Sequence, residues 1–152
     1  MLKADLPAIA ELEKVCFGAE AWSLSMLAEE LDGIGRTYVV AAAEGVVLGY
    51  GGVFVGPDFA EIMTIAVDPA QRGLGYGRLL MDHLLAVARA GGASHVFLEV
   101  ATDLGPARGL YDSLGFVPLG IRKRYYQPSG RDAIMMRLTL VGPGLVSDVP
   151  EV

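Results

Sequence analysis

Cysteine is nearly absent from this chain of 152 residues, in which Cys16 is the only one. A single thiol cannot form an internal disulfide, and it excludes a metal site built from several cysteines. The two histidines, His83 and His95, have no partners at ligand spacing, so the sequence predicts no metal. Cys16 lies on the apolar side of a predicted helix, which favours a place in the core over a role as nucleophile.

Positive charge and long apolar runs are also scarce. Lys and Arg total 12 against 18 Asp and Glu, which gives a formal net charge of −6 and argues against nucleic acid as the main partner, because phosphate affinity depends on clustered basic side chains. No stretch approaches the roughly 20 apolar residues that a membrane helix needs. The opening MLKADLPAIAELEK is too acidic for a signal peptide. We therefore expect a cytoplasmic protein that binds neither nucleic acid nor membranes.

The remaining composition is typical of a compact globular domain. Apolar residues make up 53% of the chain and charged residues 20%. The length suits one domain with its own core rather than two. We expect residues 1–140 to form this domain and residues 141–152, VGPGLVSDVPEV, to form a flexible C-terminal tail, because the tail shows no apolar periodicity.

Apolar periodicity predicts the order of helices and strands. Two helices come first, within ADLPAIAELEKVCF with Asp5 as N-cap and within SLSMLAEELDG with Ser23 as N-cap. Three strands of an antiparallel meander follow, RTYVVAAAE, VVLGYGGVFV and AEIMTIAVD. The second half predicts a helix that stops at the glycines 91 and 92, the strand HVFLEVA, the helix GPARGLYDSLG and two strands around a turn at 128–130. The order ααβββαβαββ indicates a mixed α/β domain.

Three glycines in VDPAQRGLGYGRLL stand directly before the third predicted helix, at positions 73, 75 and 77. Glycine lets bare backbone N–H groups approach a ligand, and the first turn of a helix has N–H groups without internal partners. Together with Arg72 and Arg78, this pattern predicts an anion site, and a tight turn without a ligand is the alternative. A Walker loop is excluded because no Lys-Ser or Lys-Thr follows. A Rossmann fingerprint is excluded because Arg78 occupies its third glycine position.

The string Arg-x-x-Gly-x-Gly from Arg72 to Gly77, preceded by IAVDP, resembles motif A of the GNAT acyltransferase superfamily, which binds the pyrophosphate of acetyl-CoA. The resemblance extends over nearly the whole chain and implies the GNAT fold, a mixed, mostly antiparallel central sheet flanked by helices. It implies acetyl-CoA as co-substrate and ten residues that bind it. These are Ile65, Ala66, Val67, Arg72, Gly73, Leu74, Gly75, Tyr76, Gly77 and Arg78.

The family usually opens with a strand, whereas this chain reaches ADLPAI by residue 4. We therefore expect the first strand to be shortened to Met1–Lys3, or the chain to start late. Either case weakens the edge of the sheet.

Several separate segments are similar to the RimI group of this superfamily, the ribosomal-protein N-terminal alanine acetyltransferases. They are AWS, FLEV, PARGLYDSLGF, RKRYY and DAIMM, in that order. The resemblance implies acetyl transfer to the N-terminal α-amine of a protein, with the N-terminal alanine of small-subunit ribosomal protein eighteen as acceptor. The alternatives are a small-molecule amine, another protein N-terminus, or a catalytically silent acyl-CoA-binding domain.

Glu99, at the end of the strand HVFLEVA, is the candidate general base. An α-amine has a pKa of about 7.7–8.0, so a base must take its proton before it attacks a thioester. Burial beside the cofactor is expected to raise the pKa of this carboxylate, and a structural pair with an arginine is the alternative. By the resemblance, Tyr111 is the general acid that protonates the departing thiolate. An ordinary helical tyrosine is the alternative there.

Trp22, Tyr125 and Tyr126 are the candidate acceptor-binding residues. By the resemblance, the two tyrosines hydrogen-bond the backbone of a peptide acceptor, and the alternative is that they stack on an edge strand. Trp22 either walls the site or anchors the first two helices.

Leu104 departs from the family, which commonly has an asparagine five residues after the glutamate to bond the cofactor. Leucine cannot make that bond, so we expect weaker cofactor affinity or a compensating contact from Asp103 or the backbone of Gly105. Backbone N–H groups near 65–67 are expected to hold the thioester carbonyl and the pantetheine arm, because a splayed strand offers unpaired groups.

Overall fold

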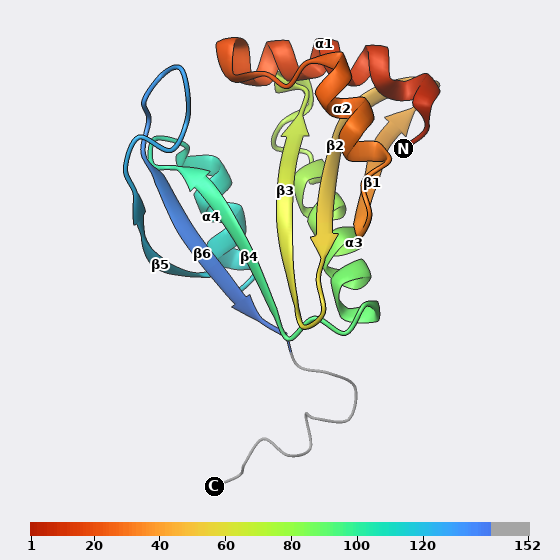
Figure 1. Ribbon diagram of the computed structural model, residues 1–152. Coiled ribbons are helices and arrows are strands. Elements are labelled where there is room, and N and C mark those ends of the chain that lie inside the picture. Colours follow the sequence, from red (N-terminus) through yellow and green to blue (C-terminus); the bar gives the residue numbers. More distant parts are fainter. Residues whose placement is uncertain (141–152) are drawn as a thin grey trace, which may run out of the picture.

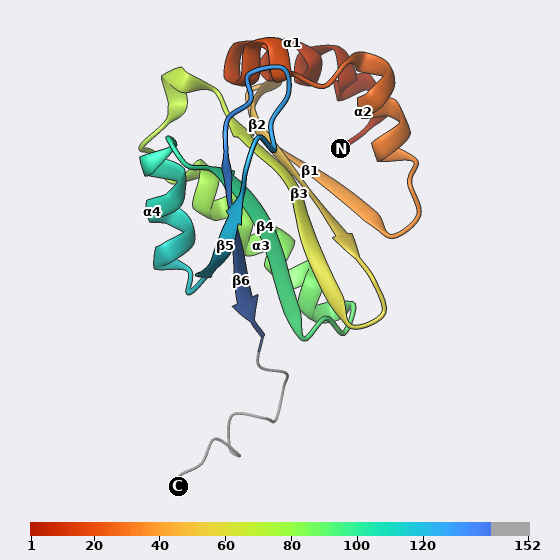
Figure 2. The same cartoon turned by 60° about the vertical axis from the view of Figure 1, so that its left-hand side comes forward.

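The structure, a computed structural model, describes residues 1–140, and the tail expected at 141–152 lies outside the described residues. The chain forms one six-stranded sheet with the strand order β1-β2-β3-β4-β6-β5. Helices α3 and α4 cover one face of the sheet, while α1 and α2 lie across one end of the other face (Figures 1 and 2). Every strand pair is antiparallel except β3 with β4. The predicted mixed, mostly antiparallel sheet flanked by helices is confirmed.

The predicted order of helices and strands is also confirmed. Three short 3-10 turns are added to it, at Lys3–Asp5, Gly18–Glu20 and Pro69–Gln71. The main elements are α1 (Leu6–Phe17), α2 (Leu24–Leu31), β1 (Arg36–Ala43), β2 (Val46–Val55), β3 (Phe59–Val67), α3 (Tyr76–Ala90), β4 (His95–Ala101), α4 (Gly105–Ser113), β5 (Val117–Arg122) and β6 (Ala133–Thr139).

The first residues differ from the expected shortened strand. Residues 1–5 contain no strand, and the first element is the 3-10 turn at Lys3–Asp5. One hydrogen bond ties this segment to the sheet, from the amino nitrogen of Met1 to the carbonyl oxygen of Tyr38 on β1 at 2.9 Å. Asp5 does not cap α1 with its side chain, because its carboxylate accepts a hydrogen bond from the backbone of Leu2 at 2.7 Å.

Ser23 caps α2 as predicted. Its hydroxyl oxygen accepts a hydrogen bond from the backbone nitrogen of Met26 at 3.2 Å. This bond satisfies one of the N–H groups that have no partner in the first turn of a helix. The cap therefore fixes where the chain turns from the loop after α1 into α2.

Two apolar cores hold the helices on opposite faces of the sheet. Side chains alternate between the faces along each strand, so Val53 of β2 belongs to the core on the side of α3, while Tyr50 belongs to the core on the side of α1 and α2. Met81 and Leu84 of α3 are fully buried in the first core, and Ile9 of α1 is fully buried in the second. Each such side chain contributes roughly 1.5–3 kcal/mol to stability. The two cores fix the helices around the middle of the sheet.

Candidate active site

A cleft opens in the middle of the sheet, where β3 and β4 separate. These parallel strands pair only between Phe59–Glu61 on β3 and His95–Phe97 on β4. Beyond these residues they diverge toward the end of the molecule that carries α1 and the loop between β5 and β6 (Figure 1). The opening holds a cleft of about 650 Å³. Because β3 has no strand partner on this side after Glu61, its remaining backbone groups are left for a ligand.

Six of the predicted site residues line this cleft, although they come from five separate segments of the chain. β4 and α4 supply the candidate base and the candidate acid. The acceptor candidates come from the loop before α2 and from the loop after β5. The six residues are Trp22, Ile65, Glu99, Tyr111, Tyr125 and Tyr126.

Glu99 lies on β4 with its side chain 14% exposed. The hydroxyl of Tyr125 donates a long hydrogen bond of 3.4 Å to its Oε1, and the Nε of Arg122 lies 3.8 Å from its Oε2. Both contacts are loose, and both partners are exposed. The arginine partner of the alternative interpretation is therefore present, but it leaves the carboxylate accessible from the cleft, where it can accept a proton.

Tyr111 lies on α4 and is 8% exposed. Its ring packs edge-on against Phe116, with ring centroids 6.0 Å apart. Burial raises the pKa of Tyr111 to about 12. Its hydroxyl makes no hydrogen bond to another residue of the described chain, and the side chain lines the cleft. The phenol therefore remains protonated at neutral pH and can donate to a group in the cleft.

Tyr125 and Tyr126 follow β5 and pack edge-on against each other, with ring centroids 5.0 Å apart. The guanidinium of Arg122 lies over the ring of Tyr125, 5.7 Å from its centroid. Burial, and then the charge of Glu99, raises the pKa of Tyr125, and burial also raises the pKa of Tyr126. The two rings contact each other in the loop after β5, not across an edge strand as the alternative interpretation expected, and both residues line the cleft.

Trp22 combines the two positions that the sequence left open. It packs against the core formed by α1, α2 and the sheet, and it also lines the cleft. Its backbone nitrogen donates a hydrogen bond of 2.8 Å to Glu13. The indole is thus held at the wall of the cleft by the same core that anchors the first two helices.

The predicted anion loop connects β3 to α3. Gly73 and Gly75 have φ of 80° and 91°, in the left-handed region that favours glycine, and Gly75 is the N-cap of α3. A Cβ at either position would meet no atom within 4 Å, so this backbone surface is open. Gly77 differs, because a Cβ there would lie 3.2 Å from the side chain of Leu110 on α4. The first two glycines shape an accessible helix N-terminus, and the third permits close packing of two helices.

The two arginines expected beside the anion have protein partners in this structure. The Nε of Arg72 donates to the carbonyl oxygen of Val67 at 3.3 Å, and its Nη2 donates to the sulfur of Cys16 at 3.7 Å. The Nη2 of Arg78 donates to the hydroxyl of Ser113 on α4 at 2.5 Å. Each arginine must therefore leave or share a partner to reach a bound anion.

The other predicted cofactor residues lie on both sides of the loop. Ala66 is buried in the core under α1 and α2, so only its backbone is available to a ligand. The carbonyl of Val67 accepts hydrogen bonds from Cys16 and Arg72. Leu74 is 67% exposed in the loop itself, and Tyr76 opens α3.

Sequence reasoning missed a charged cluster at the end of the cleft. Arg131, before β6, places one guanidinium nitrogen 2.7 Å from Glu20 and the other 3.0 Å from Asp103. These partners are 111 and 28 residues away in the chain, so no local spacing could indicate them. Leu104 lines the cleft as the N-cap of α4. Because Asp103 is engaged by Arg131, the backbone of Gly105 remains the freer of the two compensating contacts that we expect.

Glu13 is a second residue that the pattern of the sequence did not single out. It lies on α1, it is 1% exposed, and it lines the cleft. One carboxylate oxygen accepts the backbone N–H of Trp22, and the other accepts the hydroxyl of Tyr50 at 2.6 Å. Burial raises the pKa of Glu13, while the two hydrogen bonds act in the opposite direction.

Substitution Glu13→Gln is expected to remove a pH-dependent part of the free energy of unfolding. Because the pKa of Glu13 is raised above its ordinary value of 4.5, the folded protein keeps a proton that the unfolded chain has lost. Wild-type stability contributed by this group is therefore lost as the pH rises from about 4.5 through the folded pKa. Urea denaturation of both proteins at about pH 5 and pH 8 should show a larger stability advantage of the wild type at the lower pH. An advantage independent of pH would contradict this assignment.

Two further findings concern the described residues only. No group of three or more His, Cys, Asp or Glu side chains within residues 1–140 is arranged to hold a metal ion. No helix in the same range combines the length and the apolar character needed to cross a membrane.

The fold, the glycine loop and the cleft define an acyl-CoA-dependent acetyltransferase of the GNAT type, and the chain belongs to the Acetyltransferase (GNAT) family, whose model matches residues 6–116. It is 42% identical over 142 residues to the N-alpha-acetyltransferase RimI of Mycobacterium tuberculosis, covering 90% of this chain and 88% of that protein. The predicted family and group are confirmed by these matches.

Two solved structures share this fold. The ribosomal-protein-S18-alanine N-acetyltransferase of Escherichia coli superposes with a TM-score of 0.82 at 32% identity, covering 95% of both chains. Ard1 of Thermoplasma volcanium superposes with a TM-score of 0.86 at 25% identity, covering 93% of this chain and 95% of that one.

Proposed function

We propose that this protein transfers the acetyl group of acetyl-CoA to the N-terminal α-amine of a protein, and that its acceptor is the N-terminal alanine of ribosomal protein bS18. The observation that carries the proposal is the meeting of Glu99, Tyr111 and the two tyrosines after β5 in one cleft. The relatives described above act, by their names, on this class of acceptor. In this proposal the reaction takes place in the cytoplasm, where ribosomal proteins are made.

The residues between β3 and α3 fit the donor. Its pyrophosphate is a doubly charged group, and the open N-terminus of α3 at Gly73 and Gly75 offers backbone N–H groups and the positive end of a helix. The unpaired edge of β3 near Ile65 offers further backbone groups to the pantetheine arm and the thioester carbonyl. The donor then enters along β3, and its reactive end lies between β3 and β4.

Glu99 acts on the acceptor. Its carboxylate takes a proton from the α-ammonium group, directly or through a water, and leaves a neutral amine with a free electron pair. That nitrogen forms a bond to the carbonyl carbon of the thioester. Glu99 suits this step because its side chain is mostly buried yet reaches the cleft from the wall opposite β3.

Tyr111 acts on the leaving group. The carbon–sulfur bond breaks, the electron pair stays on sulfur, and the phenol donates its proton to the resulting thiolate. With its pKa raised to about 12, the hydroxyl is fully protonated at neutral pH. After attack the nitrogen still carries one proton too many, and it loses this proton to solvent as the carbonyl re-forms and the carbon–sulfur bond breaks. Solvent then reprotonates Tyr111 and takes the proton held by Glu99, so the reaction releases one proton overall.

The test is acetyl transfer from acetyl-CoA to short peptides. One peptide begins with a free alanine, in the manner of the bS18 N-terminus. A second has the same sequence with a blocked α-amine and an internal lysine, and a small primary amine serves as a third acceptor. Mass spectrometry locates the added acetyl group, and kcat/KM is measured for each acceptor.

Acetylation of the free α-amine alone is the expected result. Transfer to the lysine or to the small amine at equal or higher kcat/KM would overturn the proposal in favour of a different acceptor. Binding of acetyl-CoA without transfer to any acceptor would point to a catalytically silent acyl-CoA-binding domain.

A further inference from the structure

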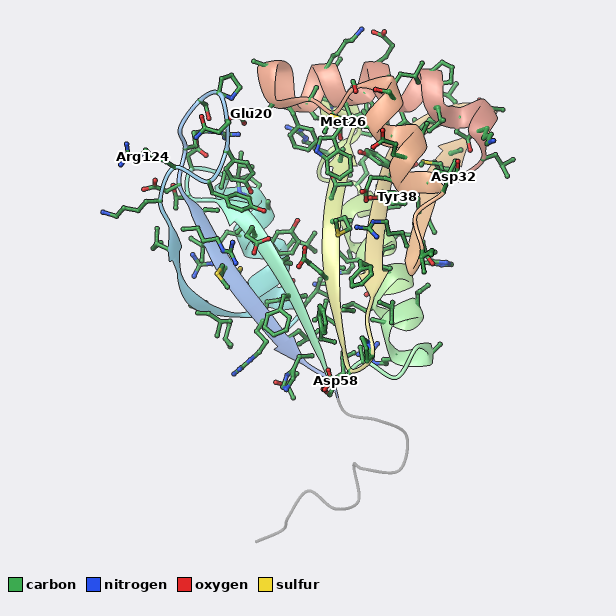
Figure 3. All side chains as sticks on the ribbon, in the orientation of Figure 1. Glu20, Met26, Asp32, Tyr38, Asp58 and Arg124 are labelled. Carbon is green, nitrogen blue, oxygen red and sulfur yellow. The ribbon has the colours of Figure 1, made fainter. Side chains whose placement is uncertain are left out.

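Three loops meet at the end of the cleft away from the paired ends of β3 and β4. The loop between α1 and α2 carries Glu20 and Trp22, the loop between β4 and α4 carries Asp103, and residues 123–132 between β5 and β6 carry Arg131. Figure 3 shows Glu20 beside the β5–β6 loop. Most of these residues line the cleft, so the loops shape its acceptor end.

Arg131 is the residue that joins all three loops. Its Nη2 lies 2.7 Å from Glu20 and its Nη1 lies 3.0 Å from Asp103. The side chain of Glu20 is 11% exposed and that of Arg131 is 32% exposed. Glu20 also accepts hydrogen bonds from the backbone nitrogen and the hydroxyl of Ser129 in the β5–β6 loop. A planar guanidinium can bind two carboxylates at once, which a lysine ammonium on a flexible stem does less well.

Arg131 also touches an acceptor candidate. Its guanidinium lies over the ring of Tyr126, 5.4 Å from the centroid, and its carbonyl oxygen accepts the backbone N–H of Tyr126 at 3.1 Å. Hydrogen bonds from Ser129 and Arg131 lower the pKa of Glu20, so its carboxylate stays ionised at neutral pH and keeps the ion pair with Arg131. The position of Tyr126 in the cleft therefore depends on the ion pairs of Arg131.

We propose that Arg131 is a positioning residue for the acceptor. Its ion pairs with Glu20 and Asp103, here called the clamp, hold the α1–α2 and β5–β6 loops at the spacing that a peptide N-terminus requires. The inference rests on the proposed function. The reacting groups Glu99 and Tyr111 lie on β4 and α4 and have no ion pair with the clamp. Loosening the clamp should weaken acceptor binding and leave the chemical step intact.

The test compares Arg131→Met and Arg131→Lys with the wild type. Arg131→Met is expected to raise KM for the free-alanine peptide about tenfold, with kcat and the KM for acetyl-CoA unchanged within about twofold. The KM for the peptide should rise less in Arg131→Lys than in Arg131→Met, because lysine keeps the positive charge. The matched control is Arg124→Met in the same loop, whose side chain has no ion pair with a described residue and points away from the molecule in Figure 3.

A double-mutant cycle with Glu20→Gln completes the test. If the two residues act as one clamp, the effect of Arg131→Met on acceptor KM is much smaller in the Glu20→Gln background than in the wild type. Amide hydrogen exchange gives a readout without an acceptor: Arg131→Met should speed exchange at the backbone N–H of Trp22 and at Ser129, and Arg124→Met should not.

The outcomes separate this inference from the proposed function. An active wild type, in which Arg131→Met leaves acceptor KM and loop exchange unchanged or lowers kcat instead, overturns only the positioning role. A wild type that acetylates no peptide α-amine overturns both.

Discussion

Substitution Glu99→Gln is expected to lower kcat for acetylation of a free-alanine peptide at neutral pH by about 10² or more, the effect of losing a general base. Glutamine keeps the shape of the side chain but cannot accept the proton of the α-ammonium group. Within residues 1–140, the carboxylate makes only the long contacts with Tyr125 and Arg122, so the fold should not change. The Kd for acetyl-CoA, measured by calorimetry, should stay within about twofold of the wild type.

The pH dependence provides a second readout of the same variant. An α-amine has a pKa of about 7.7–8.0, so the neutral fraction of the acceptor rises steeply between about pH 7 and pH 9. A variant that lacks the base depends on this fraction alone and should recover activity as the pH rises. Glu61→Gln is the matched control, because Glu61 is a half-buried carboxylate near Glu99 that does not line the cleft. Full turnover in Glu99→Gln would exclude Glu99 as the base.

Substitution Tyr111→Phe is expected to lower kcat by about 10² without loss of stability. Phenylalanine keeps the ring that packs against Phe116 and removes only the hydroxyl that lines the cleft. The departing thiolate then leaves without a proton donor. Because burial raises the pKa of Tyr111 to about 12, the wild-type phenol is protonated throughout the neutral range, and the ratio of the two rates should not change between about pH 6 and pH 9.

Tyr38→Phe is the matched control for this variant. The hydroxyl of Tyr38 donates a hydrogen bond of 2.6 Å to Glu30, outside the cleft. Its loss should lower the free energy of unfolding by roughly 0.5–1.5 kcal/mol and leave kcat unchanged. Tyr38→Phe should therefore lower the melting temperature and leave kcat unchanged, whereas Tyr111→Phe should lower kcat and leave the melting temperature unchanged. An unchanged rate in Tyr111→Phe would remove its assignment as the general acid.

Local patterns were enough to predict the helices and strands. The apolar spacing before Gly91 predicted α3, and Ser23 was predicted to cap α2. Both signals involve residues at most a few positions apart in the chain, and both predictions were confirmed. Asp5 shows the limit of such signals. An acidic residue before a helix can cap either the helix or a preceding turn, and here the 3-10 turn takes its carboxylate.

The candidate site likewise contains residues that local motifs predicted and residues that only the structure revealed. Glu99 and Tyr111 were found from the sequence because each lies in a motif, and their roles stay predictions until the variants are measured. The clamp around Arg131 and the buried carboxylate of Glu13 could not be found, since their partners are distant in the chain. Arg72 and Arg78 were expected beside an anion, whereas their observed partners are Val67, Cys16 and Ser113, which only the packed structure brings near.

The order of the elements, the glycine loop before α3 and the family follow from local sequence patterns, because these depend on residues that are neighbours in the chain. Folding of the whole chain sets where the cleft opens. The paired part of β3 and β4 ends at Glu61, and the register of β3 with β2 shifts by one residue just beyond it, between Ile62 and Thr64. Folding also sets which charges meet at the acceptor end, since an ion pair needs two side chains within a few ångströms, and residues 111 apart come that close only when the chain is folded.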